Sequence, residues 1–324
     1  MTKTNERHVP VLFHEAIDFL RVRPKGTYVD CTLGLAGHAE GIVRLLGPEG
    51  HLIGFDRDPE ALELAKARLD QVCIELGSQA PKVTLVAEAF SSIARHIEPA
   101  SVDGLLADFG VSSLQFDEAH RGFSFQADGP LDMRMDPRSG PTAAQVVNEM
   151  SEHELANLIY ENGEERRSRT VARAIVRGRQ ITTTGQLARI VASVSPPIKR
   201  DKKQGHIHPA TRTFQALRIY VNRELDEIRD LLEAAPALLK PSARLVVISF
   251  HSLEDRIAKD SLREGAQKGI WEILTRKPVT AGEEETDRNP RSRSAKLRAA
   301  EKQEAGASPP GTGNKKYGQR WKRD

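Results

Sequence analysis

Residues 27–38 of the chain read Thr27-Tyr28-Val29-Asp30-Cys31-Thr32-Leu33-Gly34-Leu35-Ala36-Gly37-His38, and residues 51–56 read His51-Leu52-Ile53-Gly54-Phe55-Asp56. The first stretch is an apolar strand that runs into a turn of small residues and then a helix. The second is an apolar strand that ends in an acid. This layout is typical of a nucleoside-cofactor site at the carboxyl edge of a parallel sheet. Small residues let the backbone approach a ligand closely, and an acid at the second strand end can accept hydrogen bonds from ribose hydroxyls.

Two cofactors and an ordinary turn all fit this layout. A dinucleotide site prefers three glycines in G-x-G-x-x-G spacing, because the pyrophosphate rests on the N-terminus of the helix. Here Leu35 and Ala36 stand between Gly34 and Gly37, so the phosphate pattern is broken. S-Adenosylmethionine has no phosphate and tolerates such a turn. A βα turn that serves packing alone fits the same residues.

The rest of the chain predicts an α/β fold with a helical insertion. Strands over 27–32, 51–56, 82–87 and 102–109 alternate with helices near 37–46 and 59–76, which favours a parallel sheet. After a loop at 120–141, helical patterns cover 142–149, 151–160, 164–178, 184–194 and one long stretch at 211–239. A strand at 243–250 and a helix at 251–268 follow, and segments 271–280 and 294–303 are expected to form a terminal antiparallel hairpin.

We therefore predict three parts. Residues 1–119 and 210–303 form a discontinuous cofactor-binding domain, and 120–209 form an all-helical insertion. Residues 304–324, which are rich in Gly, Pro and Lys, form a disordered basic tail.

Composition excludes several classes of protein. The chain contains no run of about 18 apolar residues, so no membrane span is predicted. The sequence contains no C-x-x-C and no H-E-x-x-H, so we expect no structural or catalytic zinc. It also contains no G-x-x-x-x-G-K-[ST] phosphate loop. The two cysteines fall in predicted elements, which disfavours a disulfide and favours the cytoplasm.

The charge is unevenly spread along the chain. Residues 151–224 carry 14 Lys and Arg against 7 Asp and Glu, and residues 286–324 carry 11 against 4, although the net charge of the whole chain is only +3. Basic segments of this kind occur on solvated helical faces, and they also bind polyanions. Two of them in a protein with a nucleoside-cofactor layout favour nucleic acid as a partner.

The strand ends supply the candidate site residues. Asp30, Gly34, Asp56 and Asp108 should converge where the strand order reverses. Phe90, after the third strand, is placed to lie against an adenine or to serve the core. Two other patterns carry less weight. His251 and Ser252 lack the G-x-S-x-G turn of a nucleophilic serine. His206 and His208 lack a third metal ligand in register.

Several longer motifs resemble one known family. They are His8-Val9-Pro10-Val11-Leu12, residues 30–38, Gly54-Phe55-Asp56-Arg57-Asp58, Asp108-Phe109-Gly110-Val111-Ser112-Ser113, 122–125, 128–136, 249–255 and Asn289-Pro290-Arg291-Ser292-Arg293-Ser294. Over roughly residues 7–303 the chain resembles the bacterial MraW/RsmH family, the 16S ribosomal RNA cytosine-N4 methyltransferases. The resemblance implies a Rossmann-like class I methyltransferase sheet with an RNA-binding helical insertion. It also implies methyl transfer from S-adenosylmethionine to a cytidine in the decoding centre (P-site region) of the small ribosomal subunit.

The resemblance also assigns residues. The implied cofactor contacts, together with Gly34 of the turn, are Ala36, Gly37, His38, Asp56 on the ribose, Phe90 at the adenine, Asp108 and Gln115. The family usually has glycine at the position of Ala36 and serine at that of Ala39. Alanine at position 36 should be compatible with binding if its backbone φ is negative, and a positive φ would put binding in doubt.

The expected chemistry needs an acceptor for the N4 hydrogens, and Asp108 or a carbonyl of Phe109-Gly110 is our candidate. The target base must leave its stack to enter the site. Phe123 or Phe125 is a candidate to stack on it. Arg166, Arg167 and Arg173 are candidates to hold phosphates.

Two other functions remain open from sequence. A cofactor-dependent RNA-binding module would bind the same ligands without turnover. A nicotinamide-dependent oxidoreductase would bind NAD, although the broken phosphate turn disfavours it. The sequence does not fix whether one chain or a homodimer acts.

Overall fold

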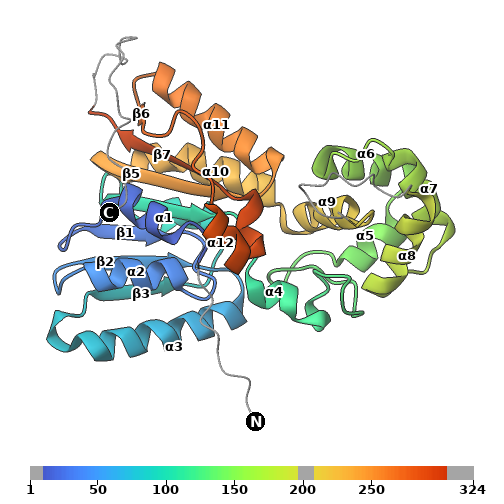
Figure 1. Cartoon of the computed structure of the whole chain (residues 1–324), viewed down its shortest axis with the longest axis horizontal. Helices are drawn as coiled ribbons and strands as arrows, with labels where there is room; N and C mark the ends of the chain where they lie inside the picture. The colour runs from blue at the N-terminus through green and yellow to red at the C-terminus, as the bar shows by residue number, and fades with distance from the viewer. Residues whose placement is uncertain (1–9, 196–207, 305–324) are drawn as a thin grey trace.

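A computed structural model describes residues 10–195 and 208–304. Residues 305–324 of the tail predicted at 304–324 lie outside the described residues. So do His206 and the first two residues of the motif that starts at His8. Figure 1 shows two lobes, one built on a sheet and one of helices alone.

The sheet lobe contains seven strands in the order β3-β2-β1-β4-β5-β7-β6. Strands β1 to β5 pair in parallel, and β7 pairs antiparallel with both β5 and β6. The pairing of β6 with β7 is the predicted terminal hairpin. The fold is therefore a mostly parallel, Rossmann-like sheet with an antiparallel end, and its order reverses between β1 and β4. The strands are β1 (Thr27–Asp30), β2 (His51–Phe55), β3 (Lys82–Val86), β4 (Val102–Asp108), β5 (Leu239–Ser249), β6 (Trp271–Ile273) and β7 (Lys296–Lys302).

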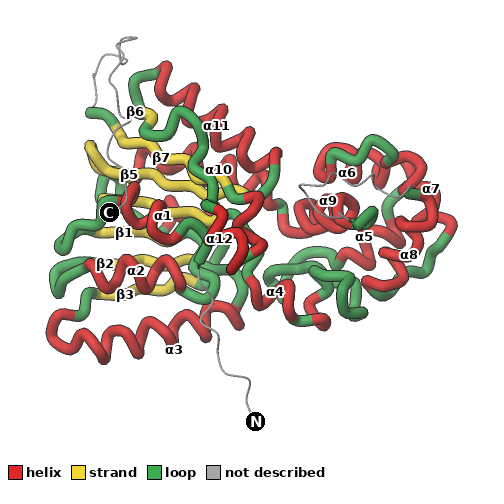
Figure 2. Tube along the Cα trace, viewed as in Figure 1, coloured by secondary structure: helices red, strands yellow, loops and turns green. Residues whose placement is uncertain are grey.

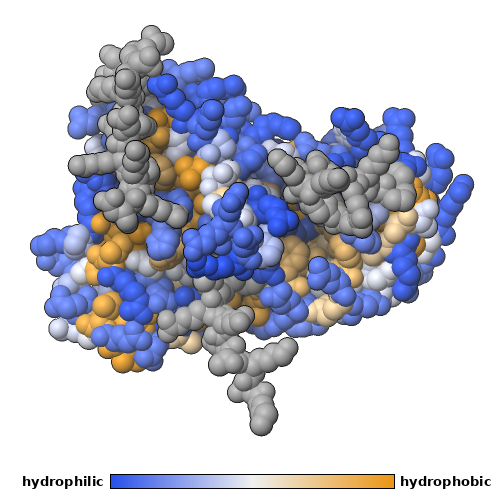
Figure 3. Space-filling model, viewed as in Figure 1, coloured by the Kyte–Doolittle hydropathy of each residue, from blue (hydrophilic) through white to orange (hydrophobic). Residues whose placement is uncertain are grey.

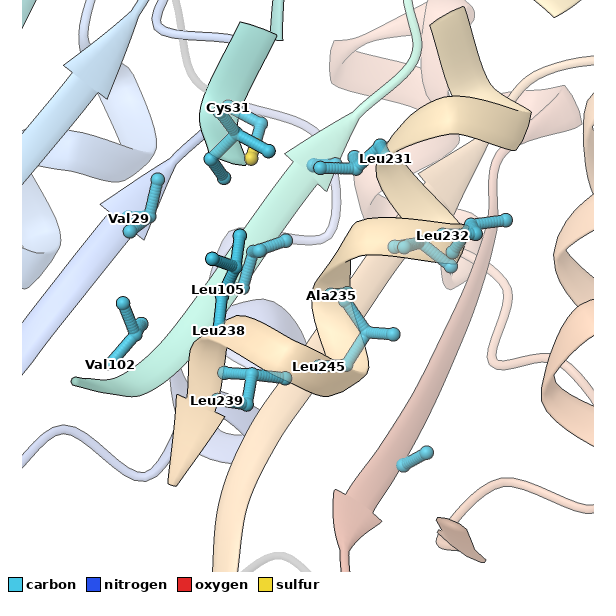
Figure 4. Close-up of a cluster of buried hydrophobic side chains, with 14 of the residues drawn as sticks. Val29, Cys31, Val102, Leu105, Leu231, Leu232, Ala235, Leu238, Leu239 and Leu245 are labelled. Atoms are coloured by element: carbon cyan, nitrogen blue, oxygen red, sulfur yellow. The ribbon is translucent and has the colours of Figure 1, made fainter. Parts of the chain in front are cut away.

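Helices cover both faces of this sheet, as parallel strands require. On one face, α1 (Phe13–Leu20), α2 (Gly37–Leu45) and α3 (Pro59–Leu76) close one hydrophobic cluster. On the other, α10 (Glu224–Leu238) and α11 (Ser252–Gln267) close a second. Figure 4 shows Leu231, Leu232 and Ala235 of α10 lying toward the buried residues of β1, β4 and β5. These layers fix the strand ends at one edge of the lobe.

The helical lobe has its own core. It contains α5 (Ala143–Glu149), α6 (Glu152–Gly163), α7 (Ser168–Arg177), α8 (Thr184–Val194) and α9 (Thr211–Asn222), and Figure 2 shows no strand among them. Capping boxes at Thr142, Ser151 and Thr183 start three of these helices by satisfying free backbone N–H groups. One hydrophobic cluster joins the lobe from Leu131 to Val221.

The prediction of one continuous helix over 211–239 is wrong, because the helix is broken at Arg223. Arg223 has φ 51° and ψ 34°, so α9 ends at Asn222 and α10 begins at Glu224. A left-handed residue cannot continue a right-handed helix, and the chain changes direction there. As a result α9 packs in the helical lobe and α10 packs on the sheet. The break puts Glu224 beside the strand ends.

The shorter elements lie around the edge where the strands end. They include α4 (Ser113–Asp117), α12 (Glu283–Arg288), and the 3-10 helices Phe90–Arg95 and Pro290–Ser294. Strand β6 ends at Ile273, well before the predicted residue 280. Beyond it, the N–H of Leu274 donates to the carbonyl of Ala299, and an isolated bridge joins Val279 to Leu297. None of the helices in the described ranges is long and apolar enough to span a membrane.

Candidate active site

A cavity opens at the carboxyl ends of β1, β2 and β4, where the strand order reverses. Its walls come from the sheet lobe, from α10 and from the loop that leads into the helical lobe. The lining residues are Pro10, Val11, 31–35, Gly37, His38, Asp56, Arg57, 88–90, 108–112, Gln115, Met135, Glu224, Ile228, Phe250 and Arg291.

The turn after β1 is tied to the end of β2. Gly34 has φ +49°, a conformation that glycine adopts at little cost, and its N–H donates to Asp56 Oδ2 at 2.8 Å. Asp56 Oδ1 accepts from the N–H of Asp58 at 2.9 Å. The Asp56 carboxyl is therefore fixed at the cavity wall, with lone pairs left for a further donor such as a hydroxyl.

Ala36 also has a positive φ, of +59°. This is the condition under which the sequence put ligand binding in doubt. However, Ala36 is fully buried in the cluster under α1 and α2 and does not line the cavity. Its methyl group therefore strains the backbone without filling the site.

Three carboxyl groups lie close together at the strand ends. Burial, aided by the charge of Asp56, raises the pKa of Asp30 to about 7, and burial, aided by the charge of Asp58, raises that of Asp56 to about 6. Burial raises the pKa of Asp108 to about 7, and the charges of Asp30 and Glu254 add to the rise. Of the three, Asp56 and Asp108 line the cavity and Asp30 lies beneath it. Such a cluster favours a cationic ligand.

The opposite wall is apolar. Phe90 and Phe109 lie with ring centroids 6.3 Å apart, and Ile228 of α10 completes the surface. Phe90 is only partly buried against the core, so a planar group can pack on it. An acid on one wall and an aromatic on the other suit a nucleoside.

A buried network joins the cavity to the loop at 121–135. Asp58 Oδ2 accepts from Gln115 Nε2 and from Arg121 Nη2, each at 2.8 Å. Arg121 also donates to the carbonyls of Arg134 and Met135. The side chain of Gln115 is thereby held at the cavity wall. His38, buried beside it, contacts the carbonyl of Val11 at 3.1 Å and lies 3.9 Å from Asp108 Oδ2.

Sequence comparison decides the family. The model of the MraW methylase family matches residues 5–303. The ribosomal RNA small subunit methyltransferase H of Acidobacterium capsulatum is 71% identical over 297 residues, which cover 92% of this chain and 99% of that protein. The protein of the same name from Koribacter versatilis is 59% identical and covers 90% of this chain and 93% of its own length. The chain belongs to the MraW methylase family.

Membership makes the protein an S-adenosylmethionine-dependent methyltransferase. One solved structure, an rRNA-methylase from Clostridium thermocellum, covers 91% of this chain and 98% of its own at 13% identity with a TM-score of 0.45. The structural similarity to that protein is too low to support the family assignment.

The cavity fits this cofactor. Asp56 offers acceptors for a ribose diol, and Phe90 offers a face for adenine. The buried acids offer negative charge to a sulfonium and an ammonium group. Seven residues predicted as cofactor contacts line the cavity, namely Gly34, Gly37, His38, Asp56, Phe90, Asp108 and Gln115. Ala36 alone among the predicted contacts does not.

The aromatic residues proposed for the target base lie elsewhere. Phe123 is buried against Phe116, with ring centroids 6.5 Å apart. Phe125 is partly buried against the core of the helical lobe, with its ring centroid 4.6 Å from that of His208 and 4.9 Å from that of Phe214. Because apolar rings in a polar loop gain most from burial, they were drawn into the nearest core rather than left at the site. Neither lines the cavity.

Sequence reasoning missed several residues of the cavity. Glu224 was hidden inside the predicted long helix, and Met135 in a loop without a clear pattern. Phe250 and Arg291 stood in motifs already singled out, but Phe250 was passed over for its neighbours His251 and Ser252. The position of Phe250 at a strand end was the signal that could have found it.

A buried polar cluster supports the cavity from below. Arg218 donates to both oxygens of Glu224 at 2.8 Å, and His251 Nε2 lies 3.0 Å from Glu254 Oε1. Ligand-type atoms of Glu224, His251 and Glu254 lie within 4.8 Å of one another. The guanidinium of Arg218 already compensates the charge of Glu224, so the protein itself satisfies this acid.

Proposed function

We propose that the protein transfers a methyl group from S-adenosylmethionine to the N4 amine of a cytidine in 16S rRNA, in the decoding centre of the small ribosomal subunit. The observation that carries the proposal is the family match over residues 5–303, joined to a cavity that fits the cofactor. The names of the two relatives from Acidobacterium and Koribacter support small-subunit rRNA as the substrate. The N4 atom and the decoding centre come from the family resemblance.

The bound cofactor would supply a methyl group on a sulfonium, which is a strong electrophile. Because the N4 lone pair of cytosine is delocalised into the ring, the protein must mainly align the two reactants. We assign the ribose hydroxyls to Asp56 and the adenine to Phe90. His38, Gln115 and the turn at Gly34 and Gly37 complete the cofactor wall.

Asp108 is our candidate to accept a hydrogen from N4. Its N–H donates to Thr32 Oγ1 at 2.6 Å, and its Oδ1 accepts from the N–H of Gly110 at 3.1 Å, so the carboxyl is held at the end of β4. With a pKa of about 7, the carboxyl can take up a proton near neutral pH.

The helical lobe is our candidate for RNA recognition. Arg166, Arg167 and Arg173 are all exposed on or just before α7. On the face shown in Figure 3, the outer edge of this lobe is mainly hydrophilic. Arginine forks suit phosphates, and their contacts would orient the RNA without reading its sequence. We propose the lobe, predicted as 120–209, as the RNA-recognition domain of a cytoplasmic enzyme.

The test is transfer of labelled methyl groups to small ribosomal subunits that lack base methylation. The wild-type protein should label the subunits, and Asp108→Ala should abolish turnover while leaving the fold intact by circular dichroism. Near-normal turnover by a folded Asp108→Ala protein would show that Asp108 neither contacts the cofactor nor accepts the N4 hydrogen in a way that the reaction needs. A protein that binds the cofactor and RNA without any transfer would be a binding module.

A further inference from the structure

The cavity extends beyond the residues that a cofactor needs. Besides Asp56 and Phe90, its lining includes Phe250 and Arg291. These two residues come from the motifs at 249–255 and 289–294, to which neither sequence nor family comparison gave a role.

Phe250 is held beside the end of β4. Strands β4 and β5 run parallel, and the N–H of Phe109 donates to the carbonyl of Ile248 at 2.9 Å. A Cβ atom at Gly110 would lie only 2.6 Å from Cε2 of Phe250. The absence of a side chain at position 110 therefore lets the ring lie against the backbone that follows Asp108.

The backbone and one side of this ring are fixed from within. The N–H of Phe250 donates to Glu254 Oε2 at 2.7 Å, and Glu254 is fully buried. The ring packs on the apolar cluster under α1 and α2, yet it is only half-buried and lines the cavity. An aromatic ring that is supported on one side and open to a cavity on another can stack a base.

Arg291 places a positive charge on the same cavity. Its Nη2 donates to Asp117 Oδ1 at 2.8 Å, and its guanidinium carbon lies 5.7 Å from the ring centroid of Phe116. Asp117 is 69% exposed, so this ion pair is weak and can yield to a stronger anion. A phosphate accepts two parallel hydrogen bonds from an arginine fork.

We propose that Phe250 and Arg291 form the subsite for the unstacked target nucleotide, with the pyrimidine stacked on Phe250 and its phosphate held by Arg291. The inference rests on the proposed function and names the substrate contacts of that site. It replaces Phe123 and Phe125, which do not line the cavity. The stacked base would lie next to Gly110 and therefore close to Asp108.

The first experiment measures nucleotide binding to the full chain loaded with S-adenosylhomocysteine. Cytidine 5′-monophosphate should bind about tenfold more tightly than cytidine, because only the nucleotide has a phosphate for Arg291. Arg291→Gln should remove that difference, and Phe250→Leu should weaken both ligands while Phe250→Tyr keeps them. Arg293→Gln is the matched control, since Arg293 is exposed on the same 3-10 helix and does not line the cavity. Unchanged S-adenosylhomocysteine affinity shows that each variant is folded.

The second experiment decides the position of the base. Small-subunit RNA with 5-iodocytidine at the methylated position is irradiated with the full chain, and the cross-linked peptide is sequenced by mass spectrometry. Attachment to Phe250 supports the subsite, and attachment to Phe123, Phe125 or another peptide overturns it. Wild-type methylation is measured in the same preparation on unmodified RNA. If the protein methylates the RNA but the cross-link lies at another peptide, the proposed subsite is wrong and the proposed function stands. If no cytidine is methylated, the proposed function itself is contradicted.

Discussion

Ala36 stores strain in the turn that we propose as part of the cofactor site. For an alanine, the left-handed conformation costs roughly 1–2 kcal/mol, and its buried methyl group returns about 0.8 kcal/mol. We therefore expect Ala36→Gly to change the free energy of unfolding by less than about 1 kcal/mol. Ala39→Gly is the control, because Ala39 is equally buried but lies inside α2. It should destabilise the protein by about 2 kcal/mol, adding loss of the methyl to the helix cost of glycine.

Urea unfolding of both variants measures this difference. Equal losses at the two positions would show that the positive φ of Ala36 carries no strain. Cofactor affinity, measured by calorimetry, should be unchanged in Ala36→Gly because the methyl group does not line the cavity.

The carboxyl cluster makes cofactor affinity depend on pH. Raised pKa values mean that the native, ligand-free protein keeps protons that the unfolded chain releases, so its stability falls as pH rises from about 4 through about 7. A cationic ligand favours the ionised acids, so its binding releases protons. S-Adenosylmethionine should therefore bind more tightly at pH 8 than at pH 6, by about tenfold for each proton released.

Calorimetry in buffers of different ionisation enthalpy counts the released protons. S-Adenosylhomocysteine, which lacks the sulfonium charge, is the natural control and should depend less on pH. Asp108→Asn should flatten the profile. Equal affinity for S-adenosylmethionine at both pH values would contradict the electrostatic role of the cluster.

At the scale of elements, the sequence predicted the regular parts of the fold well. The parallel strands and α3, including its start at Pro59, follow from apolar runs and cap residues. The break at Arg223 could not be predicted, because apolar residues continue with helical spacing through it and only the backbone conformation marks it. The site residues at strand ends could be predicted because the apolar runs that predict the strands also mark where they end. The position of Glu224 at the cavity could not be predicted, because it results from the break at Arg223. The packing of Phe125 could not be predicted either, because the sequence does not show that the core of the helical lobe lies next to it.

The junction between the lobes depends on Asn222. Its side chain donates to the carbonyls of Met133 and Arg218 and accepts from the N–H of Met135, and its own carbonyl accepts from Arg57. Asn222→Ala leaves buried backbone groups without partners, so we expect a loss of about 2–4 kcal/mol in the free energy of unfolding. Thermal and urea unfolding measure it.

Asn157→Ala provides the comparison for this junction. Asn157 lies exposed on α6, and its replacement should change stability by no more than about 0.5 kcal/mol. If Asn222→Ala were equally mild, the hydrogen bonds of the Asn222 side chain would not hold the loop at 133–135 against α9.

At the scale of the whole molecule, the cavity and the arginines of α7 lie on different lobes. Replacing Arg166, Arg167 and Arg173 together by glutamine should weaken binding of small-subunit RNA and lower the salt dependence of binding by about 2 released counterions. Filter binding at several salt concentrations measures both quantities. Cofactor affinity should stay unchanged, because none of the three lines the cavity.

A triple variant of Lys66, Arg263 and Lys268 provides the matched control. These exposed cations lie on α3, on α11 and at the C-cap of α11 in the sheet lobe, and their loss changes the net charge equally. Equal effects of the two triple variants on RNA affinity would mean that RNA responds to net charge and that the helical lobe has no special part in binding.

The most direct test of the account is to identify the methylated atom. Small subunits lacking base methylation are incubated with the protein and methyl-labelled S-adenosylmethionine, and the 16S rRNA is digested to nucleosides for mass spectrometry. We expect the label in N4-methylcytidine from one decoding-centre position. Label on another base or another atom, or none with tight cofactor binding intact, would contradict it.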